Sequence, residues 1–194
     1  MGTRNLTVVQ VDNEYKVAQY CQWDGYPSGQ GVIILNFLKN VDIDFFADKV
    51  RKCRFLTEEE HNEKVEKVIP SIKGKGWITS EESAQKLRKF PELHRDTGPD
   101  VLQMIMDSDG LELDNSIDFV GDGLFCEWAY VIDLDKKQLE VYTGFSKKRK
   151  EGRFSQFNRE DLEYAPVQLV KTYKLDKLPE EEDFIKELEN DEED

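Results

Sequence analysis

The chain has 194 residues, of which 38% are hydrophobic and 11% aromatic, so it can bury the core of one domain and is not wholly disordered. No apolar run reaches the roughly 20 residues that a membrane helix requires. The opening MGTRNLTVV lacks the apolar centre of a signal peptide. We therefore expect a cytoplasmic protein without membrane association.

The formal net charge of −14 is concentrated at the end of the chain. Residues 180–194, EEEDFIKELENDEED, hold ten acidic side chains and one Lys, so the rest of the chain carries only −5. We expect a single domain over 1–178 and an acidic tail over 179–194. Dense like charge favours a solvated tail, and a tail that guides a basic partner is the alternative. The basic cluster at 147–150 is too short to predict direct nucleic-acid binding.

Three cysteines, Cys21, Cys53 and Cys126, lie far apart and form no CxxC motif. Structural zinc needs four ligands, and the chain offers only two histidines to complete such a set. We therefore expect reduced thiols, no metal site and no cofactor.

Alternating β-branched residues predict strands over 4–11 and 15–21. Asp12-Asn13 tolerates positive φ, which predicts a tight turn and a hairpin over about 4–21. Residues 32–38 are almost continuously apolar, a pattern that fits a buried strand or a buried helix. We expect a helix, because Ser28 can cap it and Lys39-Asn40 can end it.

The middle third predicts a helical insertion. Asp42 can cap a short helix, and Thr57 and Thr79 each precede a Glu by three residues, which is the capping-box spacing. These two helices should end near Val68 and Arg88. A further helix should follow Gly98-Pro99, because proline is favoured in the first helical turn.

The last third predicts a return to strands. Residues 117–120 suggest a short strand, and 124–145 predict a second hairpin. A strand over 167–174 and a marginal helix over 179–189 complete the chain. The order strands, helices, strands predicts an α+β fold with a largely antiparallel sheet and helices packed on it.

Residues 19–31, QYCQWDGYPSGQG, gather the residue types of a binding loop. Glycines let the main chain approach a ligand closely, and Trp23 and Tyr26 offer flat contact area. The segment has neither a GxGxxG nor a GK[ST] phosphate fingerprint. The alternative is a structural turn in which Trp23 fills the core and Asp24-Gly25 forms the bend.

The opening MGTR, Lys16, and the run AQYxQWDGYPxGQG over 18–31 resemble a family of uncharacterised proteins of bacteria, their phages and some fungi. RDTG at 95–98 and FCEWAY at 125–130 are similar to that family too. The resemblance implies no activity. It implies that a shared structure or site uses Arg4, Gln22, Trp23, Asp24 and Tyr26.

The order of strands also resembles that of N-terminal-nucleophile hydrolases. Those enzymes use Cys, Ser or Thr as the first residue of the mature chain, because its free amine is the base. Removal of Met1 would expose Gly2, which carries no nucleophile. This resemblance therefore implies a fold without the catalytic groups.

Other catalytic patterns are weak in the sequence, so we assign no catalytic residue. His61 lies in a polar helical stretch and is expected on the surface, and His94 is expected at a helix end. A Cys/His dyad with Cys21 or Cys126 stays open, because such partners are close only in space. Asp114, Asp118 and Asp122 lack the spacing of a calcium loop.

Two functions follow from these patterns. The first is a non-catalytic binding protein that docks a protein partner through the aromatic loop. In the phage or mobile-element setting that the family resemblance implies, such a protein would inhibit a host system. The alternative is a small-molecule or nucleotide-binding protein or hydrolase with a pocket around QWDGYP, in which an inward Arg4 needs an anionic ligand. A concave pocket favours the alternative, and a flat exposed Trp23 favours the partner. The candidate binding residues are Arg4, Gln22, Trp23, Asp24, Tyr26 and Glu127.

Overall fold

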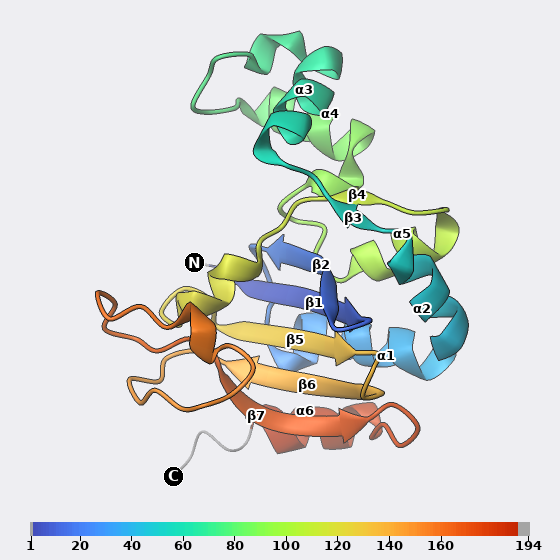
Figure 1. Cartoon of the computed structure of the whole chain (residues 1–194), viewed down its shortest axis with the longest axis vertical. Helices are drawn as coiled ribbons and strands as arrows, with labels where there is room; N and C mark the ends of the chain where they lie inside the picture. Colours follow the sequence, from blue (N-terminus) through green and yellow to red (C-terminus); the bar gives the residue numbers. More distant parts are fainter. Residues whose placement is uncertain (1, 190–194) are drawn as a thin grey trace.

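The computed structural model describes residues 2–189, and their fold is α+β, as the sequence predicts (Figure 1). One sheet has the strand order β2-β1-β5-β6-β7, in which β1 and β5 are parallel and the other neighbours antiparallel. A second sheet contains only the parallel pair β3-β4. The strands are β1 Asn5–Val11, β2 Glu14–Cys21, β3 Arg54–Phe55, β4 Glu112–Leu113, β5 Trp128–Asp133, β6 Gln138–Thr143 and β7 Gln168–Lys174.

Within residues 2–189, six α-helices accompany the sheets, together with one π-helical turn (η1) and four 3-10 turns (η2 to η5). The helices are α1 Val32–Asn40, α2 Ile43–Arg51, α3 Glu58–Val68, α4 Ser80–Lys89, α5 Asp100–Asp107 and α6 Glu181–Glu189. The turns are η1 Pro27–Gly31, η2 Pro70–Ile72, η3 Pro91–Leu93, η4 Ile117–Gly121 and η5 Ser155–Phe157.

Both predicted hairpins are present. Asp12 and Asn13 have φ angles of 55° and 60°, and their main-chain N–H groups each donate to the Asp135 carboxylate over 2.8 Å. Asp135 lies in the turn between β5 and β6, so its carboxylate joins the two hairpin turns. The second hairpin begins later than predicted, at Trp128, because the chain bends before it, where the Cys126 N–H donates to the Asp122 carbonyl.

Three of the four predicted caps are correct. Asp42 accepts the N–H of Phe45, and Thr57 and Thr79 each form a complete capping box. The cap predicted at Ser28 is wrong, because a π-helical turn over Pro27–Gly31 leads directly into α1. Here the Ser28 N–H donates to the Glu189 carboxylate instead.

The strand predicted over 117–120 is also wrong. These residues form the 3-10 turn η4, which the Asn115 side chain helps to start by accepting the Ile117 N–H at 3.1 Å. Apolar, β-branched residues favoured a strand, but here Ile117 and Val120 fill a core as part of a turn.

Two apolar cores lie on opposite faces of the sheet. The first lies between the sheet and α1, α2, α5 and α6, and it includes Ile34, Phe46 and Ile105. The second packs the other face under η4 and the segment that contains Phe154. The sheet is therefore covered by helices on one face and by turns and loops on the other.

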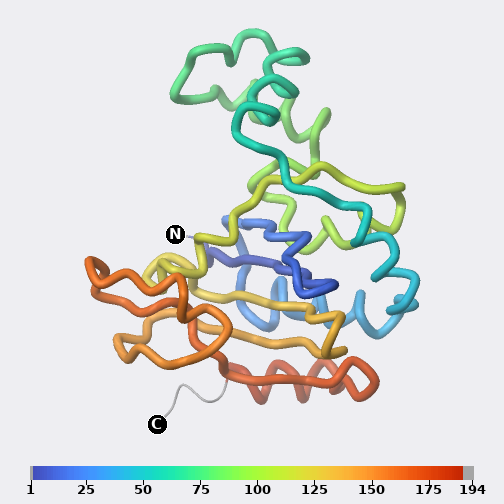
Figure 2. Tube along the Cα trace, in the orientation of Figure 1, coloured from blue at the N-terminus to red at the C-terminus, as the bar shows by residue number. Residues whose placement is uncertain are grey.

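Helices α3 and α4 project away from the sheet and form what we call the helical protrusion, residues 57–93 (Figures 1 and 2). The protrusion has a small core of its own, formed by Val65, Ile69, Phe90 and Leu93. The short β3-β4 pair lies where the protrusion meets the rest of the fold.

Helix α6 belongs to the first core, although its sequence predicted a marginal helix in a solvated tail. Phe184 and Leu188 are 0% and 3% exposed, and Glu187 accepts the Tyr173 hydroxyl at 3.0 Å. Acidic residues of this helix therefore face solvent while its apolar side is buried. Residues 190–194 of the predicted tail lie outside the described residues.

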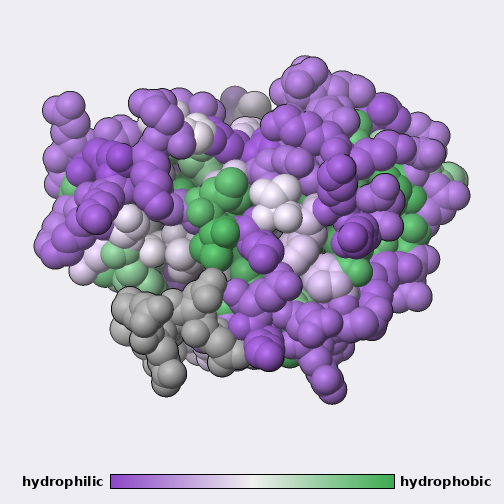
Figure 3. Space-filling model, turned by 90° about the horizontal axis from the view of Figure 1, so that it is seen from below, coloured by the Kyte–Doolittle hydropathy of each residue, from purple (hydrophilic) through white to green (hydrophobic). Residues whose placement is uncertain are grey.

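The side of the molecule that carries β7 and α6 is largely hydrophilic around a narrow apolar strip (Figure 3). Strand β7 pairs only with β6 among residues 2–189 and exposes Leu169 and Val170. None of the helices within that same range is long and apolar enough to cross a bilayer.

Candidate functional site

Four chain segments meet at the end of the sheet where β1 and β5 begin and β2 and β6 end (Figure 1). Main-chain hydrogen bonds join them, from Gly25 to Thr3 (2.9 Å), from Glu127 to Arg4 (3.1 Å) and from Gly144 to Glu127 (2.9 Å). The candidate residues of the sequence analysis belong to these segments.

The loop after β2 is held in one conformation. Asp24 has a φ of 53°, and its carbonyl accepts the Gln30 N–H at 2.8 Å. The buried Tyr130 hydroxyl of β5 donates to the Gly25 carbonyl at 2.8 Å. A Cβ at Gly29 would lie 2.3 Å from the Asp24 carbonyl oxygen, so only glycine fits there.

Large apolar side chains at this end of the sheet point to solvent. Trp23 is 49% exposed and Phe145 is 53% exposed, so Trp23 does not fill the core. Gly2 packs against one side of the Trp23 ring. We call this surface the aromatic face, and it consists of Trp23, Tyr26, Leu124, Phe125 and Phe145.

Arg4 lies beside the aromatic face. The centre of its guanidinium group is 4.4 Å from the centroid of the Phe125 ring, a cation–π contact. Its Nε atom is buried without a hydrogen-bond partner, and its guanidinium forms no ion pair within residues 2–189. Glu127, a carboxylate among the predicted site residues, accepts the Arg4 main-chain N–H at 3.2 Å and not the guanidinium.

The other candidates divide into two groups. Asp24 and Tyr26 are exposed on the loop, as a contact surface requires. Gln22 instead turns away, where its side-chain oxygen accepts the Tyr20 hydroxyl at 2.8 Å and the Arg95 guanidinium. The six candidates thus lie at one end of the sheet, but none of them lines any of the hollows described below.

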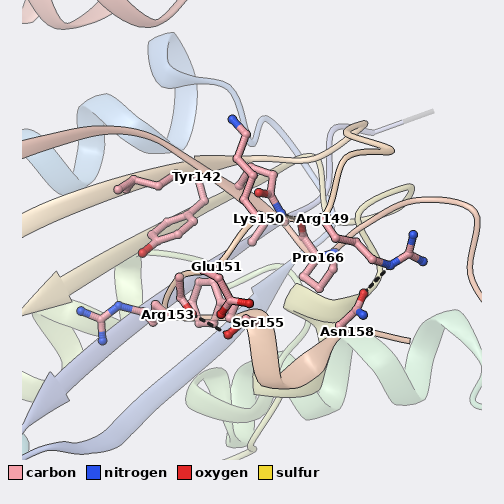
Figure 4. A pocket seen from close by; sticks show the side chains of 13 residues that line it. Tyr142, Arg149, Lys150, Glu151, Arg153, Ser155, Asn158 and Pro166 are labelled. Atoms are coloured by element: carbon pink, nitrogen blue, oxygen red, sulfur yellow. Dashed lines mark hydrogen bonds between the residues drawn. The ribbon is translucent and has the colours of Figure 1, made fainter. Parts of the chain in front are cut away.

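One hollow of about 210 Å³ lies over β6 and β7, lined by Tyr142, Arg149 to Ser155 and Pro166 to Leu169 (Figure 4). The head groups of Arg149 and Arg153 point in opposite directions from it (Figure 4). Arg149 is held by the carbonyls of Arg159 and Leu162. The Arg149 guanidinium is therefore already hydrogen-bonded within the loop.

Arg153 lies at the centre of a buried ion cluster that the sequence did not reveal. It donates to Glu140 at 2.6 and 2.8 Å and also bonds Asp133, which is fully buried. Burial raises the pKa of Glu140, but hydrogen bonds from Arg153 and Tyr142 outweigh it and hold the pKa below its usual value. Because every charged group here has partners, the cluster is structural.

The two histidines are more buried than their sequence contexts suggested. His61, expected on the surface, contacts Asp114, and its side chain is 21% exposed. His94 is 5% exposed and lies against Ser83. Both belong to a polar cluster between the protrusion and the sheet. The sequence gives no sign of it, because its members come from four separate elements.

The three cysteines are buried free thiols, and burial raises the pKa of each. Across residues 2–189, no group of three or more His, Cys, Asp or Glu side chains is placed to hold a metal ion. The structure therefore offers no reactive thiolate.

No protein-family model, curated protein or solved structure matches the chain. The resemblance that its first 31 residues bear to uncharacterised proteins therefore stays a prediction. Function must be inferred from the geometry.

Proposed function

We propose that this chain is a non-catalytic binding protein that docks a protein partner on the aromatic face. The observation that carries the proposal is the set of large apolar side chains, from separate loops, that are exposed at one end of the sheet, where Phe125 contacts an arginine without an acidic partner in residues 2–189. Single exposed apolar residues are common on soluble proteins. A group of aromatic residues beside an arginine is the composition of an interface hot spot.

The chemistry of Arg4 indicates what the partner presents. A guanidinium that lies over an aromatic ring keeps its N–H donors in its own plane, where a carboxylate can accept two of them. We therefore infer a partner segment that is apolar and carries a carboxylate, either a side chain or a chain end. Asp24 and Glu127 flank the face and would repel a partner with further acidic groups nearby.

The rigidity of the face supports docking. The contacts of Tyr130 and Gln30 already hold the loop of Trp23 and Tyr26 in place. A surface that is ordered before binding loses little conformational entropy when the partner arrives. The alternative, a ligand pocket around QWDGYP, lacks a corresponding observation, because the hollow over β6 and β7 is lined by other residues.

The test places a photocrosslinking amino acid at position 26, and at position 77 as the matched control. Trp77 is 66% exposed on the protrusion, which projects away from the sheet (Figure 1). A protein crosslinked from position 26 and not from position 77 is then purified and its affinity measured by calorimetry.

Trp23→Ala should weaken that binding by about 2 kcal/mol, roughly 30-fold, while Trp77→Ala leaves it unchanged. Arg4→Lys, which keeps the charge but loses the planar fork, should weaken it as well. Equal affinity for the wild type and Trp23→Ala would show that the aromatic face is not the docking surface.

A further inference from the structure

The two histidines and a lysine form a polar cluster where α3 and α4 meet the sheet. Asp114, just after β4, lies 2.5 Å from Nδ1 of His61 on α3. The other ring nitrogen of His61, Nε2, lies 3.2 Å from Nζ of Lys86 on α4. The three groups therefore form a continuous chain of carboxylate, imidazole and amine.

The contacts of His61 show which of its ring nitrogens carries the hydrogen. A carboxylate only accepts, so Nδ1 of His61 carries the hydrogen that Asp114 binds. The lone pair of Nε2 then faces Lys86. An imidazole oriented in this way by a carboxylate is the arrangement that withdraws a proton from a nucleophile.

His94 has the opposite arrangement. Its Nδ1 accepts the Asp96 main-chain N–H at 3.2 Å, so its Nε2 carries the hydrogen and donates it to Ser83 Oγ, also at 3.2 Å. Ser83 is therefore a hydrogen-bond acceptor toward His94 and not an activated nucleophile. Its own hydroxyl hydrogen stays available for a ligand.

Lys86 reaches a hollow of about 230 Å³ between the protrusion and β2. A single water needs only about 10–15 Å³ of such space, so the hollow has room for a small organic molecule. Ser83, Arg95 and Asp114 line the same hollow, which therefore offers two cationic groups and one carboxylate, the latter already bonded to His61. Burial lowers the pKa of Lys86, so more of its amine is neutral than in an exposed lysine.

We propose that Lys86 is a nucleophilic amine that forms an imine with a small 2-oxo acid bound in this hollow. His61 would be the base, Asp114 its positioning residue, and Arg95 and Ser83 the ligands of the substrate carboxylate. The site is separate from the aromatic face, so either proposal can fail without the other.

The reaction balances without any further reagent. His61 takes a proton from the Lys86 ammonium group, and the neutral amine attacks the carbonyl carbon, forming a C–N bond as the C=O π electrons move to oxygen. A proton moves from the new ammonium nitrogen to that oxygen, which gives a carbinolamine. His61 then returns its proton to the leaving hydroxyl group, so water departs and a protonated imine remains.

The test uses the whole chain with pyruvate and sodium cyanoborohydride, which reduces an imine to a stable amine that peptide mass spectrometry can locate. Lys89, exposed on the same helix, is the internal control. At neutral pH we expect Lys86 to be modified at least about tenfold faster than Lys89, because a positioned general base alone accelerates a proton-transfer step by about 10²–10⁴-fold.

Two variants, together with acetaldehyde as a second probe, test the roles assigned to His61 and Arg95. His61→Gln should slow modification of Lys86 and shift the midpoint of its pH profile to higher pH. Arg95→Gln should raise the pyruvate concentration needed for half-maximal modification without changing the reaction with acetaldehyde, which has no carboxylate. If Lys86 reacts no faster than Lys89, or if His61→Gln changes nothing, the nucleophilic role is wrong. If Arg95→Gln slows the reactions with pyruvate and with acetaldehyde to the same extent, the carboxylate site is wrong.

Discussion

The sheet region and the helical protrusion are stabilised by different means. The sheet lies between cores of 22 and 11 buried apolar residues, whereas the protrusion buries four. The protrusion relies instead on polar contacts with the sheet region, such as His61–Asp114 and Lys64–Glu112. Exposed and half-exposed ion pairs contribute little stability, so the protrusion should open at a lower free energy than the sheet.

This difference bears on both proposed sites. The aromatic face is built on strand ends of the sheet region, which keeps it rigid. Lys86 and Ser83 lie on the protrusion, whereas Asp114 and Arg95 lie outside it. Local opening of the protrusion would therefore separate the groups of the Lys86 site and leave the aromatic face intact.

The largest expected effect concerns the sheet region. Phe184→Ala removes a fully buried ring that packs against Tyr173, and we expect the free energy of unfolding to fall by about 3–5 kcal/mol. Phe45→Ala, at a site 51% exposed, is the matched control and should change it by less than about 0.5 kcal/mol. Urea denaturation measures both. A negligible loss of stability in Phe184→Ala would mean that α6 is dispensable, which is what the prediction of a solvated acidic tail implies.

The second effect should stay within the protrusion. Ile69→Ala removes a buried side chain of the small core and should cost about 2–3 kcal/mol. Hydrogen exchange should accelerate in α3 and α4 while β1 and β5 keep their protection, and exposed Val68→Ala should have no such effect. Equal acceleration in β5 would show that the two regions unfold as one unit.

The third prediction concerns acid. Hydrogen bonds from Ser71, the Thr79 main chain and Lys75 lower the pKa of Glu82 to about 2. The ordinary Glu pKa is about 4.3, so the unfolded chain binds this proton first. The contribution of Glu82 is thus full above about pH 4.3 and is lost as the pH falls toward 2.

Protection of α4 from hydrogen exchange should therefore decrease over this range. Glu82→Gln keeps an oxygen for the cap but cannot titrate, so its α4 should lose protection less steeply than the wild type. Exposed Glu81→Gln is the control and should follow the wild type. Identical profiles for wild type and Glu82→Gln would contradict the prediction.

The sequence predicted local structure well wherever short-range chemistry decides it. Alternation and the Asp12-Asn13 turn gave the first hairpin, and the spacing of Thr57 and Glu60 gave a capping box. Long-range packing decided the failures. The acidic side chains of α6 obscured an apolar face that becomes visible only against the sheet, and the Asp114–His61–Lys86 chain joins residues up to 53 positions apart.

The smallest expected effect concerns Asp24. It separates a role of this residue in the backbone conformation from a contact of its carboxylate with the partner. Its φ of 53° lies in the left-handed region, which Asp and Asn tolerate better than Ala. Asp24→Ala should therefore lower the free energy of unfolding by about 1 kcal/mol, and Asp24→Asn by less than about 0.5 kcal/mol. Asp24→Ala alone would therefore mix strain with loss of charge.

Asp24→Asn removes only the charge. Once the partner is purified, the affinities of Asp24→Asn and of Asp24→Gly, which also accepts positive φ, show whether the carboxylate takes part in binding. If the carboxylate contacts the partner, both variants bind more weakly while their stability stays near that of the wild type. If it only flanks the face and repels acidic groups, both variants bind an acidic partner as well as or better than the wild type, and Asp24 then acts through specificity and not through attraction.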